Sequence, residues 1–167
     1  SRGHIWDHLQ RAEARGQNLE VAVVLGAHPA VHLAAGAKVA MEVDEFDIAG
    51  ALIGQPVELV KCKTIDVEVP TNAEIVLEGE ILANTHEEEG PFGEYTGYST
   101  FRSTKNLFVV KAITRRAKPI YLDIIPGYST EHLLLGRVAK EAHVYHRLKE
   151  VLPTLKALNY PKSGTHF

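Results

Sequence analysis

Residues 57–82 read VELVKCKTIDVEVPTNAEIVLEGEIL, and this stretch decides the fold. Apolar residues recur at every second position over much of 57–69 and again over 74–82. A period of two is typical of strands that bury one face, and Pro70-Thr71-Asn72 separates the two runs as a turn. The sequence therefore predicts one strand over 57–69 and a second over 74–82.

Further strand pattern follows downstream. Two apolar runs, 107–114 and 120–125, are separated by a polar turn at 115–118, which predicts a hairpin-like antiparallel pair. Pro119 stands near the start of the second run, where a missing N–H is tolerated. Residues 84–100 hold too many Gly, Pro and Glu for regular structure, so we expect a loop there.

Helical pattern occupies the start and the end of the chain. An amphipathic helix is predicted over 5–15, a second helix over 29–35 with Pro in an early position, and a long helix over 130–151. The β-branched run 19–25 predicts a buried strand, and 47–54 is compatible with either strand or helix. Antiparallel strands flanked by helices indicate an α+β domain, and a small barrel fits this order best.

Composition limits the classes of function. With 167 residues, 45% of them hydrophobic, the chain can bury one core, so one compact domain is expected. A net charge of -3 argues against a nucleic-acid partner. The single Cys62 cannot form an internal disulfide, and no apolar run is long enough for a membrane span. We expect a soluble, cytoplasmic protein, and both ends have the look of a fragment.

The stretch with most chemical content is EEEGPFGEYTGY, residues 87–98. Glu89 and Glu94 are five residues apart, about 16 Å in a fully extended chain, and the Gly-Pro-Phe-Gly insert between them shortens that distance by bending. Two carboxylates held close together cannot both ionise freely, so such a pair supplies an acid and a base. A surface loop that uses Gly and Pro only to turn is the alternative.

This acidic stretch resembles the signature loop of the UbiD decarboxylases. The likeness continues through VELVKC at 57–62 and VPTNAEIVLEG at 69–79, and it extends over essentially the whole chain. It implies that residues 1–167 are a single domain, the central cofactor-binding and catalytic-loop domain of a longer enzyme. The fold implied is an antiparallel split β-barrel like those of flavin reductases and FMN-binding proteins, flanked by helices.

The resemblance also implies a reaction. UbiD enzymes are carboxy-lyases that reversibly and non-oxidatively decarboxylate aromatic, heteroaromatic or α,β-unsaturated acids with prenylated FMN. By position, Glu94 would protonate the product carbon, and Glu89 would pair with an Arg. That Arg is implied to lie upstream of Ser1.

A metal site is implied by the same likeness. The family holds Mn²⁺ or Mg²⁺ with an Asn, a His and a Glu, and the metal anchors the flavin phosphate; K⁺ is a further candidate ion. His4 and Glu45 match the His and the Glu, while the Asn is implied to lie upstream of the chain. Without the resemblance His4 has competitors, because three His pairs have helical spacing: His4/His8, His28/His32 and His143/His146.

Substrate and assembly are the last expectations. Tyr95, His132 and Leu133 match regions that border the substrate pocket in the family. The partners implied are a small unsaturated or aromatic acid, a flavin prenyltransferase whose product is the cofactor, and further copies of the full-length protein. The alternative is a flavin- or metal-binding module, or an oligomerisation module, without independent activity.

Overall fold

The computed structural model describes residues 4–37, 39–93, 97–100, 105–125 and 127–161. In these residues the chain forms helices α1 to α4 and strands β1 to β7. Contacts between Cα atoms divide the chain into two compact units. The first unit comprises residues 1–28, 58–92 and 100–123, and the second comprises 29–57, 93–99 and 124–167.

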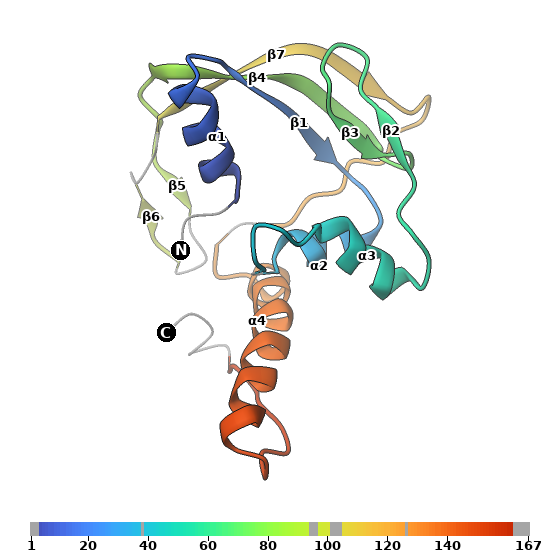
Figure 1. The fold of residues 1–167 in the computed structure, drawn as a ribbon, viewed down its shortest axis with the longest axis vertical. Coiled ribbons are helices and arrows are strands. Elements are labelled where there is room, and N and C mark those ends of the chain that lie inside the picture. The colour runs from blue at the N-terminus through green and yellow to red at the C-terminus, as the bar shows by residue number, and fades with distance from the viewer. Residues whose placement is uncertain (1–3, 38, 94–96, 101–104, 126, 162–167) are drawn as a thin grey trace. The chain divides into compact units, whose positions relative to one another are not determined.

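A three-stranded antiparallel sheet is the centre of the first unit (Figure 1). Its order is β1 (Leu19–Leu25), β4 (Ile75–His86) and β7 (Asn106–Arg115), so β4 is the middle strand. The register of β1 against β4 runs without interruption from Leu19↔Ile81 to Leu25↔Ile75. These strands confirm the predictions over 19–25, 74–82 and 107–114.

Helix α1 (His4–Ala14) packs on this sheet and confirms the predicted first helix. Apolar spacing predicts Ile5, Leu9 and Ala12 on its inner face; Leu9 and Ala12 are 2% and 1% exposed, whereas Ile5, in the first turn, is 55% exposed. The helix is followed by Gly16, whose φ of +66° lets the chain turn directly into β1. Apolar spacing and one glycine therefore account for this α-to-β step.

The prediction of one strand over 57–69 is wrong. The segment is a hairpin of β2 (Leu59–Lys61) and β3 (Glu68–Pro70), closed by a bond from Cys62 N–H to the carbonyl of Val67 at 2.9 Å. The backbone N–H groups of residues 63 and 64 are bound by a carboxylate from β4. The turn between β2 and β3 is thus bound by a side chain that is distant in the sequence. The alternation of apolar residues over 57–69 gives no sign of this contact.

The prediction of a strand over 120–125 is also wrong. These residues form no regular structure, and β7 pairs with β4 instead. The N–H of Ile120 donates to the carboxylate of Glu74 at 2.9 Å, so it is not available to a strand ladder. Ile120 and Tyr121 are 70% and 65% exposed, which shows that their apolar character does not reflect burial within this unit.

The expected loop over 84–100 contains more structure than its composition indicates. Strand β4 continues to His86, and two short strands, β5 (Phe92–Gly93) and β6 (Ser99–Thr100), form a small sheet. The residues between β4 and β5 remain irregular. Part of the prediction therefore holds, for residues 87–91.

The second unit contains three helices: α2 (Pro29–Ala35), α3 (Glu45–Ile53) and α4 (Thr130–Val151). Helices α2 and α3 pack around Ala30, Ala34 and Ala49. Residues 47–53 of the ambiguous segment lie in α3, and the N-cap Asp44 stabilises its first turn by accepting from Phe46 N–H at 2.8 Å. Gly54, with φ of +85°, ends the helix.

Helix α4 has the bounds that the sequence predicts. Ser129 is its N-cap and accepts from the N–H of His132 at 3.2 Å. The chain then returns along the helix, where Glu141 accepts from Tyr160 N–H at 2.7 Å. Arg137 donates to the carbonyl of the same Tyr160 at 3.4 Å.

The α+β class is confirmed, and within the described ranges the sheets are open rather than closed into a barrel. Among these residues, no helix is both long and apolar enough to cross a membrane.

Candidate functional site

The acidic loop leaves the sheet at the paired ends of β4 and β7. Glu87 N–H donates to the carbonyl of Lys105 at 2.9 Å, and the Lys105 ammonium forms an ion pair with Glu88. Glu89 follows at once and is exposed. Glu94 and Tyr95, two further predicted site residues, lie outside the described residues. Glu89 thus directly follows two residues, Glu87 and Glu88, that are both bound to Lys105.

His4 and Glu45, the predicted metal ligands, each occupy the first position of a helix. His4 begins α1 in the first unit, and Glu45 begins α3 in the second, next to the N-cap Asp44. Both side chains are half-buried. An imidazole and a carboxylate suit a divalent ion such as Mn²⁺ or Mg²⁺ in donor type. Within the described ranges, no three His, Cys, Asp or Glu side chains form a metal-binding group.

His132 and Leu133 lie in the first turn of α4. The Nδ1 atom of His132 accepts from Gly127 N–H at 3.2 Å, which leaves Nε2 to carry the proton when the ring is neutral. Leu133 is only 4% exposed and belongs to the core of its unit. The same turn therefore offers one oriented imidazole and one packing residue.

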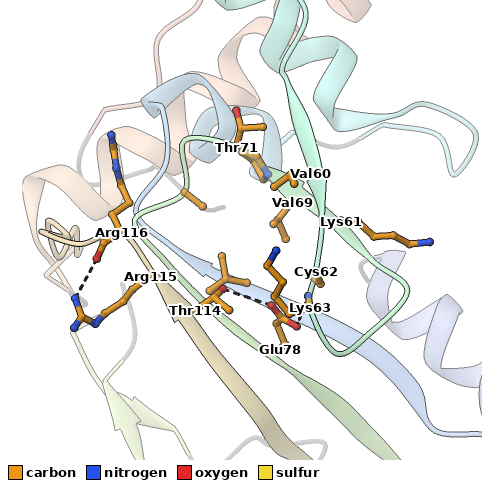
Figure 2. Close-up of a pocket in the computed structure, with 13 residues that line it drawn as sticks. Val60, Lys61, Cys62, Lys63, Val69, Thr71, Glu78, Thr114, Arg115 and Arg116 are labelled. Atoms are coloured by element: carbon orange, nitrogen blue, oxygen red, sulfur yellow. Dashed lines mark hydrogen bonds between the residues drawn. The ribbon is translucent and has the colours of Figure 1, made fainter.

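A pocket of about 270 Å³ lies in the first unit between the β2–β3 hairpin and strands β4 and β7 (Figure 2). Glu78, on β4, is 1% exposed and lines it. One carboxylate oxygen accepts from Lys63 N–H at 2.9 Å, from Thr64 N–H at 2.7 Å and from the Thr64 hydroxyl at 2.8 Å. The other accepts a longer bond from Thr114 at 3.4 Å.

These contacts set the charge of Glu78. Burial, the largest single influence, raises its pKa, but the hydrogen bonds from Lys63, Thr64 and Thr114 together outweigh burial and lower it. Glu78 is therefore ionised at neutral pH. Burial and this nearby charge raise the pKa of the Cys62 thiol, which stays protonated at the same pH.

Four basic residues line the pocket, and Lys61, Arg115 and Arg116 among them have side-chain partners. Lys61 pairs with Asp66 at 2.6 Å, and Arg116 pairs with Glu74 at 3.0 Å. Arg115 donates to backbone carbonyls of its own turn. In Figure 2 the side chains of Lys61 and Arg115 point away from the centre of the pocket. The bonds from Lys63 and Thr64 to Glu78 anchor the β2–β3 hairpin to β4.

Most of the chain matches a known protein family. The family model UbiD, described as the 3-octaprenyl-4-hydroxybenzoate carboxy-lyase Rift-related domain, matches residues 1–129. That is well over half of the chain. The chain belongs to the UbiD family.

Two relatives of this chain carry the names of decarboxylases. Phenolic acid decarboxylase of Bacillus subtilis is 38% identical over 156 residues, which cover 87% of this chain and 31% of that protein. Anhydromevalonate phosphate decarboxylase of Methanothermobacter thermautotrophicus is 34% identical over 161 residues, which cover 96% of this chain and 38% of that protein. The chain therefore spans about a third of the length of these UbiD relatives.

Solved structures of UbiD-class enzymes share the fold. The UbiD-class enzyme HmfF from Pelotomaculum thermopropionicum, in an evolved dimeric form with prFMN, matches with a TM-score of 0.94 and 46% identity. The match covers 99% of this chain and 38% of that one. Vanillic acid decarboxylase of Sedimentibacter hydroxybenzoicus matches with a TM-score of 0.83 and 33% identity, over 93% of this chain and 34% of its own.

Sequence reasoning did not find Glu78, although a signal for it exists. Residues two apart on a strand point to the same face, so Glu78 lies on the same face of β4 as Val76, which is 5% exposed. A charged residue at an inward position of a strand predicts either a partner or a network of donors. The structure shows a network of donors.

Proposed function

We propose that this chain is the central cofactor-binding and catalytic-loop domain of a UbiD-type carboxy-lyase. The reaction is the reversible, non-oxidative decarboxylation of an aromatic, heteroaromatic or α,β-unsaturated acid. The observation that carries this proposal is the likeness to HmfF, whose solved complex contains prFMN and matches 99% of this chain at 46% identity. At that identity over nearly the whole chain, the residues around the site are expected to be shared as well as the fold.

In this proposal the two loop carboxylates have different tasks. Glu94 holds the proton that is delivered to the product carbon, and Glu89 pairs with an arginine of the full-length protein beside the substrate carboxylate. The contacts of Lys105 with Glu87 and Glu88 support this assignment, because they restrict the directions in which the loop can leave the sheet. A positioned general acid typically accelerates such a step by about 10²–10⁴-fold.

The cofactor is proposed to be prenylated FMN, which supplies the electron sink for loss of CO₂ when it is bound. His4 and Glu45 would hold a divalent ion, Mn²⁺ or Mg²⁺, that anchors the flavin phosphate. Their donor types and half-buried positions at helix starts support this role. K⁺ is proposed as a further ion, and Tyr95, His132 and Leu133 as the border of the substrate pocket.

The proposal extends to the fold, the assembly and the cofactor supply of the full-length enzyme. The sheet of β1, β4 and β7 would form part of an antiparallel split β-barrel, which its antiparallel register supports. The full-length protein would assemble with copies of itself in the cytoplasm and receive its cofactor from a flavin prenyltransferase.

A second candidate function is a flavin- and metal-binding module, or an oligomerisation module, that does not turn over by itself. The observation in its favour is that the chain spans 31% and 38% of the length of its named decarboxylase relatives. The first proposal concerns the full-length enzyme, and the second concerns the chain by itself, which is expected not to release CO₂.

The test uses the full-length protein loaded with cofactor and a panel of hydroxybenzoates, cinnamates and furan carboxylates. CO₂ release and deuterium uptake from D₂O into the product are measured. Glu94→Gln is expected to lower turnover at least about a hundredfold, whereas Glu87→Gln, a matched loss of charge in the same loop, leaves it unchanged. Full turnover by Glu94→Gln would show that the role of Glu94 is wrong.

A further inference from the structure

The ladder between β4 and β7 is interrupted just before the acidic loop. Pairing runs to Ile81↔Phe108 and resumes at His86↔Asn106. The chain therefore advances five residues on β4, from 81 to 86, and two on β7, from 108 to 106. This is a bulge with three extra residues on β4. Bulges redirect a strand, and here the redirected strand leads into the loop that carries Glu89.

The N–H groups of the bulge are bound by side chains from outside the ladder. Ala83 N–H donates to Asn18 Oδ1 at 3.0 Å, and Asn84 N–H donates to Glu13 Oε1 at 3.2 Å. Glu13 lies in the last turn of α1, and Asn18 immediately precedes β1. One side chain from the last turn of α1 and one from the residue before β1 thus bind two backbone N–H groups of the bulge.

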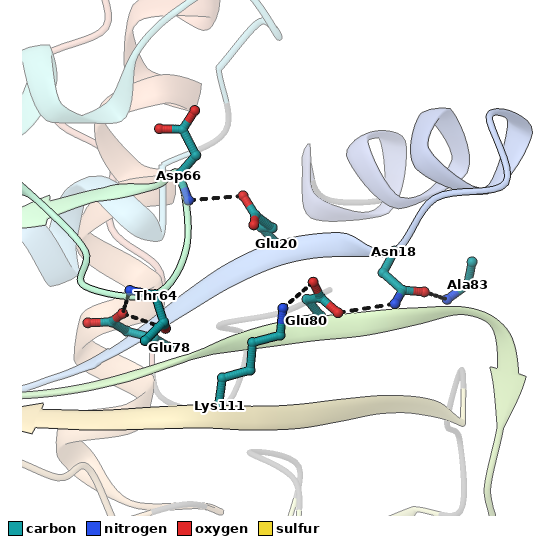
Figure 3. A network of polar contacts seen from close by, with 8 residues as sticks. All are labelled: Asn18, Glu20, Thr64, Asp66, Glu78, Glu80, Ala83 and Lys111. Carbon is teal, nitrogen blue, oxygen red and sulfur yellow. Dashed lines mark hydrogen bonds and ion pairs between the residues drawn. The ribbon is translucent and has the colours of Figure 1, made fainter.

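Both of these side chains are themselves oriented. The second oxygen of Glu13 accepts from the Gln10 side chain at 2.7 Å. The Asn18 amide nitrogen donates to Glu80 at 3.1 Å, and Glu80 forms an ion pair with Lys111 on β7. Figure 3 shows this line of contacts running across the sheet from Lys111 to Ala83. These additional contacts restrict the orientations of the Glu13 and Asn18 side chains that bind the bulge.

The backbone is strained at both roots of the loop. Asn84 has φ of +51° and Lys105 has φ of +58°, and within the described ranges these are the non-glycine residues with positive φ. Such conformations persist where surrounding contacts determine them, and they occur frequently at functional sites. Glu13 and Asn18 supply those contacts on the β4 side.

We propose that Glu13 and Asn18 are positioning residues for the acidic loop. They fix the direction in which β4 leaves the sheet, and they tie that exit to α1, the helix that begins with His4. The inference rests on the proposed function for the roles of Glu89 and His4. Both hydrogen bonds lie within one compact unit, which contains the loop root and α1.

Glu20 provides a matched control. Its carboxylate accepts from the N–H of Asp66 at 3.0 Å, the same type of exposed bond, but it holds the β2–β3 turn rather than the loop root. Glu13→Ala and Asn18→Ala are compared with Glu20→Ala, and Glu13→Gln serves as the rescue variant because its amide oxygen can still accept from Asn84. The four variants replace three side chains, all outside the core, so folding is expected to survive.

The first readout is the amide NMR spectrum of the ¹⁵N-labelled chain. Glu13→Ala and Asn18→Ala are expected to shift the resonances of residues 87–93, Glu20→Ala to leave them in place, and Glu13→Gln to restore them. Unmoved loop resonances in both alanine variants would overturn the proposal. This readout requires no turnover, so it stands apart from any failure of the proposed function.

The second readout is the pH profile of the full-length enzyme. A displaced loop alters the surroundings of its carboxylates, so Glu13→Ala is expected to shift the profile of kcat and to lower kcat about three- to thirtyfold with KM within twofold. A profile that matches wild type, despite shifted loop resonances, would also overturn the positioning role. The proposed function fails separately, by full turnover of Glu94→Gln.

Discussion

Replacing Glu78 with alanine is expected to lower the free energy of unfolding by about 3 kcal/mol. Three short hydrogen bonds reach its carboxylate from Lys63 and Thr64. Bonds to a charged acceptor contribute about 1.5–3 kcal/mol each, but Lys63 and Thr64 are exposed, and water replaces part of the loss. About 1 kcal/mol for each bond is therefore the reasonable figure.

The assay is urea unfolding of the isolated chain, with a thermal scan beside it. At about 2–4 °C per kcal/mol for a chain of this size, the variant is expected to melt about 6–12 °C lower. Glu80→Ala is the control, because Glu80 lies two positions along the same strand and is paired with Lys111 near the surface. A loss below about 1 kcal/mol for Glu78→Ala would refute the reasoning.

The pH dependence of the free energy of unfolding tests independently whether the ionised form of Glu78 stabilises the fold. The pKa of Glu78 is lowered by folding from its ordinary value of 4.5, so its stabilisation is fully present above that value. It is lost as the pH falls through the lower pKa of the folded state. The stability gap between wild type and Glu78→Gln is therefore expected to close below about pH 4.5. A gap that widens on acidification would contradict this assignment.

Two further predictions concern neighbours of Glu78. Gly79→Ala is expected to cost about 3 kcal/mol in urea unfolding, because its Cβ would lie 2.1 Å from the carbonyl of Val109 and force β4 and β7 apart; a loss within about 0.5 kcal/mol would contradict this. Cys62 is expected to react with iodoacetamide at pH 7 more slowly than in the urea-unfolded chain, and faster in Glu78→Gln than in wild type, because its raised pKa depends in part on the Glu78 charge. Equal alkylation rates in the three samples would show that the pKa is not raised.

Local periodicity predicts most of the elements in this fold. The bounds of 19–25 and 130–151 follow from apolar spacing alone and agree with the structure. The two errors have a common cause, since each involves backbone N–H groups bound by a distant carboxylate. Glu78 binds the turn between β2 and β3, and Glu74 binds Ile120. Such contacts join residues far apart in the sequence and leave no periodic signal.

In the candidate site, too, local sequence predicts some features, and contacts between distant residues determine the others. The acidic residues of 87–94 stand out because Gly and Pro interrupt a run of glutamates, and the family resemblance implies roles for Glu89 and Glu94. The bulge at Asn84 and its partners Glu13 and Asn18 have no such signature, because each is an ordinary polar residue until the fold brings them together. Only the three-dimensional structure reveals how the loop is held.

The most direct test of the central claim is a titration of the chain with FMN, with and without Mn²⁺, followed by flavin fluorescence. The account predicts binding that Mn²⁺ strengthens, that is lost in His4→Ala and in Glu45→Ala, and that persists in His8→Ala, one turn further along α1. FMN binding that ignores Mn²⁺ and survives both His4→Ala and Glu45→Ala would contradict it.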